Sequence, residues 1–194
     1  GYQRRVCLDI SIQALREARE RIGTHGLFVV ADLANLPFKT EAFDGEVSMH
    51  AIHHLALEEH PRAYTELYRV LKPGHTAAIV NGWHEPLLSR MAEPLIGVMR
   101  RLSGKSAKKK KNWLEEDDPA GTFVRKMTPE WLKREVGSHM PLEIRPWRSM
   151  STRLLRWFIH PKLGGKYFLR IIFLLEDTFP RFFAENGQYP LIVI

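Results

Sequence analysis

The sequence predicts an α/β fold built on a mostly parallel β-sheet. Three short apolar runs, at residues 5–9, 27–32 and 43–50, alternate with segments whose apolar residues recur at helical spacing. A fourth apolar run follows at residues 75–83, after a Pro-Gly pair that ends a helical segment. Strands that alternate with helices favour a parallel sheet covered on both faces. Ligands of such sheets bind at the carboxyl ends of the strands, so we expect functional residues there.

Local signals define the elements of the first half. Ser11 is placed to cap a helix that extends to Ile22. Gly23 and Gly26 bracket the turn into the second strand. A second helix is expected over residues 58–71, where apolar side chains share one face.

The second half predicts further helices and two more strands. Residues 83–102 show an amphipathic helical pattern that we expect to be interrupted at Pro94. Thr128 is placed to cap a short helix, and residues 142–149 and 189–194 read as strands. The apolar segment between these strands, residues 151–186, is interpreted either as core or as a hydrophobic lid over a lipid-like or aromatic substrate.

Length and composition indicate one globular domain with a large insertion. The chain has 194 residues, 44% of them hydrophobic and 26% charged, which excludes collagen, coiled coil and wholesale disorder. The single cysteine, Cys7, excludes a disulfide framework and a thiolate metal cluster. No apolar run approaches the ~18 residues of a transmembrane helix. Residues 1–5 do not form a signal peptide, and we expect a cytoplasmic protein.

Charge is unevenly distributed along the chain. Residues 1–82 contain nine Lys and Arg against ten Asp and Glu, whereas residues 83–194 contain twenty against twelve. The basic second half is compatible with an anionic partner or with peripheral contact at a membrane surface.

Two acids mark the ends of neighbouring strands. Asp9 follows the first apolar run and Asp32 ends the second. A carboxylate at such a position can accept two hydrogen bonds from vicinal hydroxyls. Each acid taken alone could also be a helix-capping or turn residue, but the pair at equivalent strand ends favours a ligand site.

The order and spacing of four segments resemble class I S-adenosylmethionine-dependent methyltransferases. The segments are "CLDIS", "ADLANLPF", "FDGEVSMHAIHHL" and "ELYRVLKPG", and the likeness covers residues 5–83. It points to the branch that methylates small molecules, quinones and some tRNA wobble bases. The resemblance implies a Rossmann-like three-layer sandwich whose last strand runs antiparallel to the others.

The resemblance also implies roles for individual residues. Asp9 would receive the ribose hydroxyls of S-adenosylmethionine, and Ile10 would pack on its adenine. Asp32 and Leu33 would meet the adenine edge, and Met49 would lie beside the methionine part. Residues 1–83 would form the cofactor-binding half of the domain. Residues 84–194 would supply the lid, the insertions and the last two strands.

One element of the family is missing from this sequence. Its first strand and the glycine-rich loop behind it should precede Asp9, but only eight residues do. We interpret the chain as truncated at its N-terminus and expect the fragment itself to be inactive. The missing strand would lie between the strands that end at Asp9 and His50, so these two should not pair.

Three histidines, His50, His53 and His54, follow the third strand. Their spacing would place them on one helical face, as in some zinc sites, but no cysteine or suitably spaced acid accompanies them, and we expect no metal. One of them could act as a general base, because histidine titrates near neutrality. Methyl transfer from a sulfonium mostly needs positioning, so this catalytic role is a secondary hypothesis.

The leading hypothesis is methyl transfer to a small or lipid-like oxygen, nitrogen or carbon nucleophile. The alternatives are an RNA-modifying methyltransferase and a non-catalytic nucleic-acid-binding module with a degenerate methyltransferase fold. The basic run from Lys105 to Lys111 is either a solvated loop or a contact for RNA or lipid phosphates. Retention of both Asp9 and Asp32 argues against degeneracy.

Overall fold

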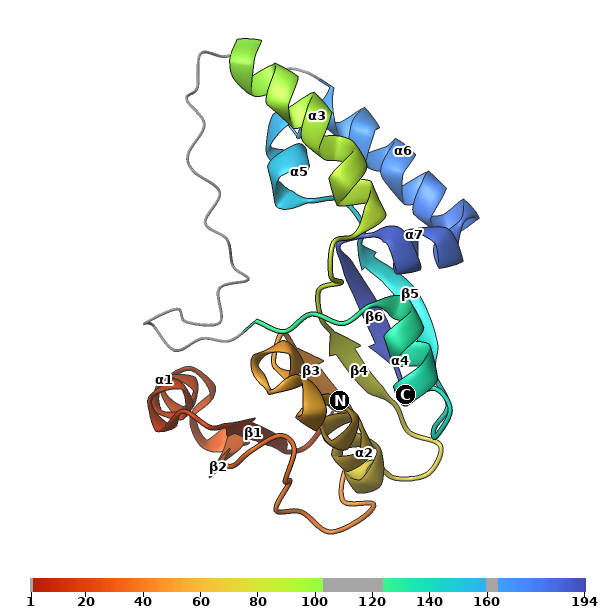
Figure 1. Cartoon of the computed structure of the whole chain (residues 1–194). Helices are drawn as coiled ribbons and strands as arrows, with labels where there is room; N and C mark the ends of the chain where they lie inside the picture. The colour runs from red at the N-terminus through yellow and green to blue at the C-terminus, as the bar shows by residue number, and fades with distance from the viewer. Residues whose placement is uncertain (1, 103–123, 160–163) are drawn as a thin grey trace. The chain divides into compact units, whose positions relative to one another are not determined.

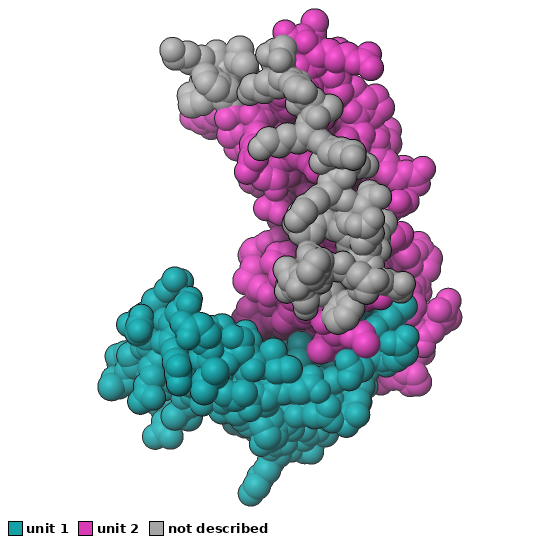
Figure 2. Space-filling model, turned by 60° about the vertical axis from the view of Figure 1, so that its left-hand side comes forward, with its two compact units in different colours: residues 1–46, 57–77 teal, residues 47–56, 78–194 magenta. Residues whose placement is uncertain are grey.

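The computed structural model describes residues 2–102, 124–159 and 164–194 (Figure 1). These residues form two compact units, which have different colours in Figure 2. Unit 1 consists of residues 1–46 and 57–77, and unit 2 of residues 47–56 and 78–194.

Unit 1 begins with a strand, a helix and a second strand. Strand β1 (Arg5–Asp9) leads into helix α1 (Ile12–Ile22), and a single 3-10 turn (Gly23–His25) leads into strand β2 (Gly26–Val30). The two strands pair in parallel, with Arg5 opposite Gly26 and Asp9 opposite Val30. The Ser11 side chain accepts a hydrogen bond from the Ala14 N–H, which confirms the predicted helix cap.

The second helix of unit 1 is α2 (His60–Val70), preceded by a short 3-10 turn (Leu57–Glu59). Its buried face carries Ala63, Tyr64, Leu67 and Val70. Directly after α2, Leu71 forms a parallel bridge with Phe43. Gly74 turns the chain with a φ of 75°, a conformation that glycine adopts without strain.

A four-stranded sheet forms the core of unit 2. Strands β3 (Glu46–Met49), β4 (Ala77–Val80), β5 (Glu143–Arg148) and β6 (Tyr189–Val193) lie in the order β3-β4-β6-β5. Strand β6 runs antiparallel to both β4 and β5, as expected for the last strand. Ile79 and Ile192 face each other in this ladder and are fully buried.

The strands of the described residues fall into two separate sheets. Strands β1 and β2 form one sheet, and β3 belongs to the other, so within the described residues the strand that ends at Asp9 is not paired with the strand that ends before His50. No strand in the described ranges pairs with both of them.

The helices of unit 2 follow its strands. They are α3 (Leu87–Leu102), α4 (Pro129–Glu135), α5 (Thr152–Phe158), α6 (Gly165–Thr178) and α7 (Pro180–Asn186). The Thr128 side chain caps α4, as predicted. None of the helices within the described ranges is long and apolar enough to cross a lipid bilayer.

Two features of these helices bear on the sequence predictions. Helix α3 continues through Pro94, so the expected interruption was wrong. Pro94 is exposed to solvent. A packing contact on another side stabilises the helix, because Ala92 and Ile96 of α3 are buried against Leu154 of α5. Trp157 and Phe158 pack against this same cluster, which assigns that part of the 151–186 segment to a helical core.

Candidate functional site

The two predicted acids lie at the same edge of the sheet in unit 1. Asp9 is the last residue of β1, and Asp32 comes two residues after the parallel strand β2. The Ala31 N–H donates to the Asp9 carbonyl over 3.2 Å and extends the pairing to this edge. The Asp9 carboxylate is exposed, and its Oδ1 accepts a bond of 2.8 Å from the Ser11 N–H.

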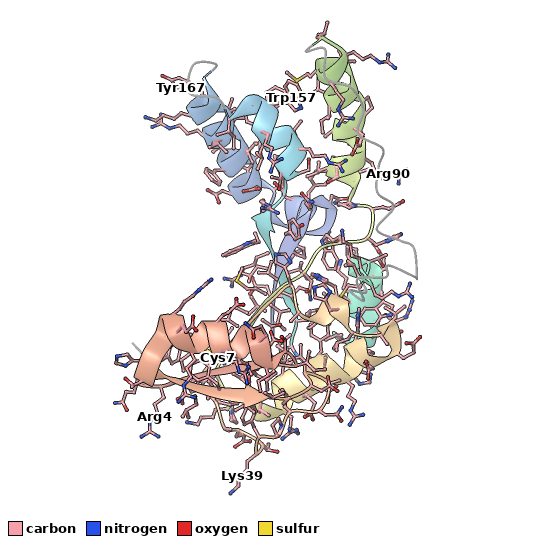
Figure 3. The ribbon with its side chains drawn as sticks, turned by 90° about the vertical axis from the view of Figure 1, so that its left-hand side faces the viewer. Arg4, Cys7, Lys39, Arg90, Trp157 and Tyr167 are labelled. Atoms are coloured by element: carbon pink, nitrogen blue, oxygen red, sulfur yellow. The ribbon has the colours of Figure 1, made fainter. Side chains whose placement is uncertain are left out.

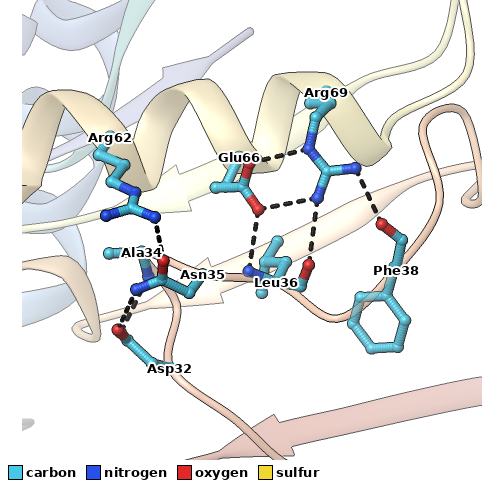
Figure 4. Close-up of polar contacts among 8 residues, drawn as sticks. All are labelled: Asp32, Ala34, Asn35, Leu36, Phe38, Arg62, Glu66 and Arg69. Carbon is cyan, nitrogen blue, oxygen red and sulfur yellow. Dashed lines mark hydrogen bonds and ion pairs between the residues drawn. The ribbon is translucent and has the colours of Figure 1, made fainter.

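Asp32 is held by its own loop (Figure 4). Its Oδ1 accepts a bond of 2.9 Å from the Ala34 N–H, and its Oδ2 accepts a bond of 2.7 Å from the Asn35 side-chain amide. The Asn35 carbonyl oxygen accepts in turn from the guanidinium of Arg62 on α2. These bonds fix the orientation of the half-buried Asp32 carboxylate.

An ion pair on α2 holds the following part of this loop (Figure 4). The Leu36 N–H donates to Glu66 Oε2 over 2.9 Å. The Arg69 guanidinium donates to both Glu66 oxygens at 2.8 Å and to the carbonyls of Phe38 and Leu36 at 2.8 and 3.1 Å. The pKa of Glu66 is lowered, chiefly because its carboxylate accepts hydrogen bonds from Arg69. The loop that presents Asp32 is therefore fastened to a helix.

The two apolar residues beside these acids differ in exposure. Ile10 is 77% exposed, and Leu33 is half-buried. A large exposed apolar side chain directly after the Asp9 carboxylate matches the needs of a ligand with a flat ring beside a pair of hydroxyls. A shallow depression lined by Arg19, Gly23 and Thr24 lies at the start of β2, at the end of this strand away from Asp32.

The first predicted residues of unit 2 lie at the end of β3. Met49 is the last strand residue and is 51% exposed. His50 follows with a φ of 57°, a left-handed conformation that is uncommon outside glycine. Its backbone N–H donates to the Val80 carbonyl over 2.7 Å, which holds the turn against β4. Such strained residues gather at functional sites, so this turn is a candidate for one.

His53 is buried, with 8% of its surface exposed. It lies in a 3-10 turn (Ile52–His54), so the expectation that His50, His53 and His54 share one helical face was wrong. His53 Nδ1 is 3.3 Å from the Asn81 side-chain oxygen. That oxygen can only accept, so a hydrogen bond over this contact requires the tautomer in which Nδ1 carries the proton and Nε2 keeps its lone pair. His54 is exposed, and its ring centroid lies 4.3 Å from that of His53.

A cleft of about 530 Å³ in unit 2 brings some of these residues together. Strand ends, the start of α5 and two residues of α3 contribute to its wall. The lining residues are His50, His53, Gly82, Ser89, Glu93, Val124, Lys126, Ser151, Thr152, Arg153, Gln188 and Tyr189. The residues that the 151–186 segment contributes are polar, and its predicted aromatic pair, Trp157 and Phe158, is not among them.

The cleft is partly desolvated. Burial lowers the pKa of His53 to about 4 and is also the main cause that lowers the pKa values of His50 and Lys126. Both imidazoles are therefore neutral at pH 7 and can accept a proton or a hydrogen bond. The His50 ring meets the Tyr189 ring edge-on at 4.9 Å, and the Arg148 guanidinium lies 4.4 Å from the Tyr189 ring centroid.

Buried polar atoms without a partner gather around this cleft. Within the described residues, Ser89 Oγ and Gln188 Oε1, both in cleft-lining residues, make no hydrogen bond. The same holds for Nδ2 of Asn81, whose other side-chain atom contacts His53. Unpaired buried polar atoms are costly and rare, so a cluster of them beside a cleft indicates that a polar ligand binds there.

No metal site accompanies these residues. The described ranges contain no group of three or more His, Cys, Asp or Glu side chains that could hold a metal ion. The predicted basic run from Lys105 to Lys111 lies outside the described residues.

The sequence analysis missed several cleft residues. Asn81 had a signal, since a polar residue directly after an apolar strand marks the strand end. Lys126, Gln188 and Tyr189 had none, because only the antiparallel return of β6 and the approach of residues 124–127 bring them beside His53.

Known proteins resemble this chain in sequence over its first part. Residues 1–79 match the family model described as a methyltransferase domain. A 2-phytyl-1,4-naphtoquinone methyltransferase from Nostoc punctiforme is 36% identical over 84 residues, which cover 41% of this chain and 35% of that protein. The match thus spans about a third of the length of that curated relative.

Solved structures resemble the chain over its whole length. An S-adenosylmethionine-dependent methyltransferase from Mesorhizobium loti aligns with a TM-score of 0.58 at 15% identity, and the alignment covers 100% of this chain and 80% of the Mesorhizobium chain. A possible histamine N-methyltransferase from Thermotoga maritima aligns with a TM-score of 0.55 at 16% identity, and the alignment covers 100% of this chain and 82% of the Thermotoga chain. At these identities the likeness establishes the fold, which is Rossmann-like.

Proposed function

We propose that this protein, whose residues 1–79 match the methyltransferase domain family, transfers a methyl group from S-adenosylmethionine to a small-molecule acceptor held in the cleft of unit 2. The observation that carries the proposal is the cleft itself, with two neutral imidazoles and unpaired buried polar atoms in its wall. The curated relative's name supports a naphthoquinone-type ring as the acceptor. In this proposal residues 1–83 carry the cofactor site and residues 84–194 cover the acceptor.

The residues at the strand ends of unit 1 would hold the adenosine half of the cofactor. The exposed Asp9 carboxylate keeps acceptor capacity beyond its bond to Ser11 and would receive the ribose hydroxyls. Ile10 offers an exposed apolar surface for the adenine, and the loop of Asp32 and Leu33 would meet its edge. Met49, at the end of β3, is assigned to the methionine part.

The protein's contribution to the reaction is positioning, exclusion of water and handling of one proton. The bound cofactor supplies an electrophilic methyl group on a sulfonium. His53 Nε2 would accept the acceptor's hydroxyl proton, because Nδ1 is committed to Asn81. Burial favours the neutral imidazole, so this lone pair is available at neutral pH. Lys126 would stabilise the oxygen as it becomes anionic.

Binding measured by saturation-transfer NMR tests both halves of the proposal. With S-adenosylhomocysteine as the probe, we expect signal on the adenine and ribose protons that disappears in Asp9→Ala. The matched control is Asp177→Ala, an exposed acid on α6. Equal signals in wild type and Asp9→Ala would refute the assignment of Asp9.

A dihydroxynaphthalene serves as the acceptor probe. We expect its ring protons to receive saturation from the wild-type chain and to lose it in Gln188→Leu and Tyr189→Ala. The control is Tyr68→Ala, an exposed aromatic on α2. A signal that persists in both cleft variants would place the probe elsewhere and contradict the proposed acceptor site.

A further inference from the structure

Three helices of unit 2 form a surface with an unusual composition, here called the helical tip. It consists of residues 94–102 of α3, 152–159 of α5 with its C-cap, and 164–174 of α6 with its N-cap. In Figures 1 and 3 the C-terminal end of α3 and the N-terminal end of α6 lie at the same end of these helices, and Figure 3 labels Tyr167 and Trp157 there.

The helical tip exposes large apolar side chains. Their exposed fractions run from 43% at Ile159 to 84% at Leu102. On α3 they repeat at spacings of three and four residues, and on α6 at spacings of four and three, so each helix presents a continuous apolar stripe to solvent. The exposed residues are Leu95, Val98, Leu102, Ile159, Tyr167, Ile171, Phe173 and Leu174.

These stripes are separate from the packed faces of the same helices. On α3 the buried residues are Ala92 and Ile96, and on α6 the buried residues include Ile172. The exposed stripes are therefore additional to what the fold itself needs. Soluble monomers rarely expose contiguous apolar surface of this kind without a binding role.

The helical tip carries only positive charge. Its ranges contain six cationic side chains and no Asp or Glu; the cations are Arg100, Arg101, Arg153, Arg156, Lys166 and Arg170. The neighbouring acids along the chain are already bonded, Glu93 to Arg153 over 3.4 Å and Glu176 to the hydroxyl of Ser149. Beyond these lies Asp177, at the other end of α6.

We propose that the helical tip docks on an anionic lipid bilayer, with the stripes of α3 and α6 in the interface and the arginines and Lys166 at the headgroups. Apolar stripes bordered by Arg and Lys are the pattern of helices that lie in a membrane surface. Anionic headgroups complement six cations. If the helical tips of two copies paired, the six cations of one copy would face and repel the six cations of the other. If RNA were the partner, the apolar stripes would stay in contact with water.

Vesicle flotation of the full chain tests this docking. The probes are vesicles of phosphatidylcholine alone and of equal parts phosphatidylcholine and phosphatidylglycerol. We expect binding to the anionic vesicles that is at least about tenfold tighter than to the neutral ones and weakens with salt. Absence of binding to the anionic vesicles, or equal binding to both kinds, overturns the proposal.

Matched variants locate the contact. Ile171→Ser/Leu174→Ser should weaken anionic-vesicle binding about tenfold, whereas Leu87→Ser/Met91→Ser, exposed apolar residues near the start of α3, should change it less than about twofold. For charge, Lys166→Gln/Arg170→Gln should weaken binding by about tenfold, and the control is Arg90→Gln/Arg181→Gln, which are exposed outside the tip.

Two further outcomes count against the proposal. All variants alter exposed side chains, and unchanged circular dichroism and melting confirm that they fold. Equal loss in test and control variants would mean a non-specific surface. Concentration-dependent dimers that disappear in Ile171→Ser/Leu174→Ser, without vesicle binding, would assign the tip to self-association instead.

Discussion

The loop that presents Asp32 should depend on a single guanidinium. Arg69 makes four hydrogen bonds of 2.8 to 3.1 Å, two to the Glu66 carboxylate and one each to the carbonyls of Leu36 and Phe38. Arg69→Ala removes all four at once. Leu36 is 8% exposed, so its carbonyl would lose a partner in a place that water reaches poorly.

The size of the effect follows from what is left unpaired. A buried acceptor without a partner costs about 1–3 kcal/mol, and hydrogen bonds to charged groups contribute about 1.5–3 kcal/mol. The Arg69 side chain is 30% exposed and that of Glu66 is 18% exposed, so water replaces part of the ion pair. We therefore expect Arg69→Ala to lower the free energy of unfolding by about 3 kcal/mol.

Urea unfolding measures this loss, and amide hydrogen exchange locates it. The Leu36 N–H, which donates to Glu66, should lose protection in Arg69→Ala. Arg69→Lys keeps the positive charge but lacks the planar guanidinium. Its free energy of unfolding should lie between those of wild type and Arg69→Ala. The control is Arg62→Ala, whose exposed bond to Asn35 should cost less than about 1 kcal/mol. A loss below that figure in Arg69→Ala, or unchanged exchange at Leu36, would refute the argument.

The same ion pair should make stability depend on pH. The folded pKa of Glu66 lies below its ordinary value of 4.5, so the unfolded state binds more protons than the folded state as pH falls through that range. The stabilisation is present above that value and is lost as pH falls through the folded pKa. Arg69→Ala should show a smaller acid-induced loss than wild type, because the largest cause of the shift is gone. If stability fell with pH in the same way in both proteins, the Glu66–Arg69 pair would not be the cause of that pH dependence.

Three further predictions concern other sites. Burial raises the pKa of Glu46 to about 7, so the charged carboxylate destabilises the folded state increasingly as pH rises from 4.5. Glu46→Gln should therefore have a higher melting temperature than wild type at about pH 8 and the same melting temperature at about pH 4. Equal melting temperatures of the two proteins at both pH values would contradict the burial argument. Trp157→Ala should lower the free energy of unfolding by about 2 kcal/mol, since the half-buried ring packs against the cluster of Ala92, Ile96 and Leu154. A small loss of stability together with a raised Michaelis constant would support the lid interpretation instead. Calorimetry on residues 1–194 should show that S-adenosylmethionine binds with a dissociation constant well above the micromolar range, because these residues hold no glycine-rich loop before Asp9; micromolar binding with a cooperative melt would contradict this.

The local features of the fold could be predicted from the sequence. Ser11 and Thr128 cap their helices, because a cap depends on a side chain and an N–H three residues away. The positions of Asp9 and Asp32 at one sheet edge follow from two apolar runs and a helix between them, since parallel strands end at the same edge.

Other features depend on contacts that sequence spacing does not encode. Pro94 is tolerated inside α3 because neighbouring residues pack against α5, some sixty positions along the chain. His53 became a buried, neutral imidazole through Asn81, 28 residues away, and through desolvation that only the packed unit provides. The left-handed turn at His50 replaced the expected helical face.

By itself the sequence determined the type of fold, the acids at the strand ends and the charge difference between the halves, because these properties reside in short segments. Only the tertiary structure decided which side chains share the cleft, since β6 returns antiparallel and brings Gln188 and Tyr189 beside residues that follow β3 and β4. It also decided which apolar stripes of α3 and α6 are packed and which face solvent. Periodicity shows that a helix has an apolar face, but burial depends on whether another element covers it.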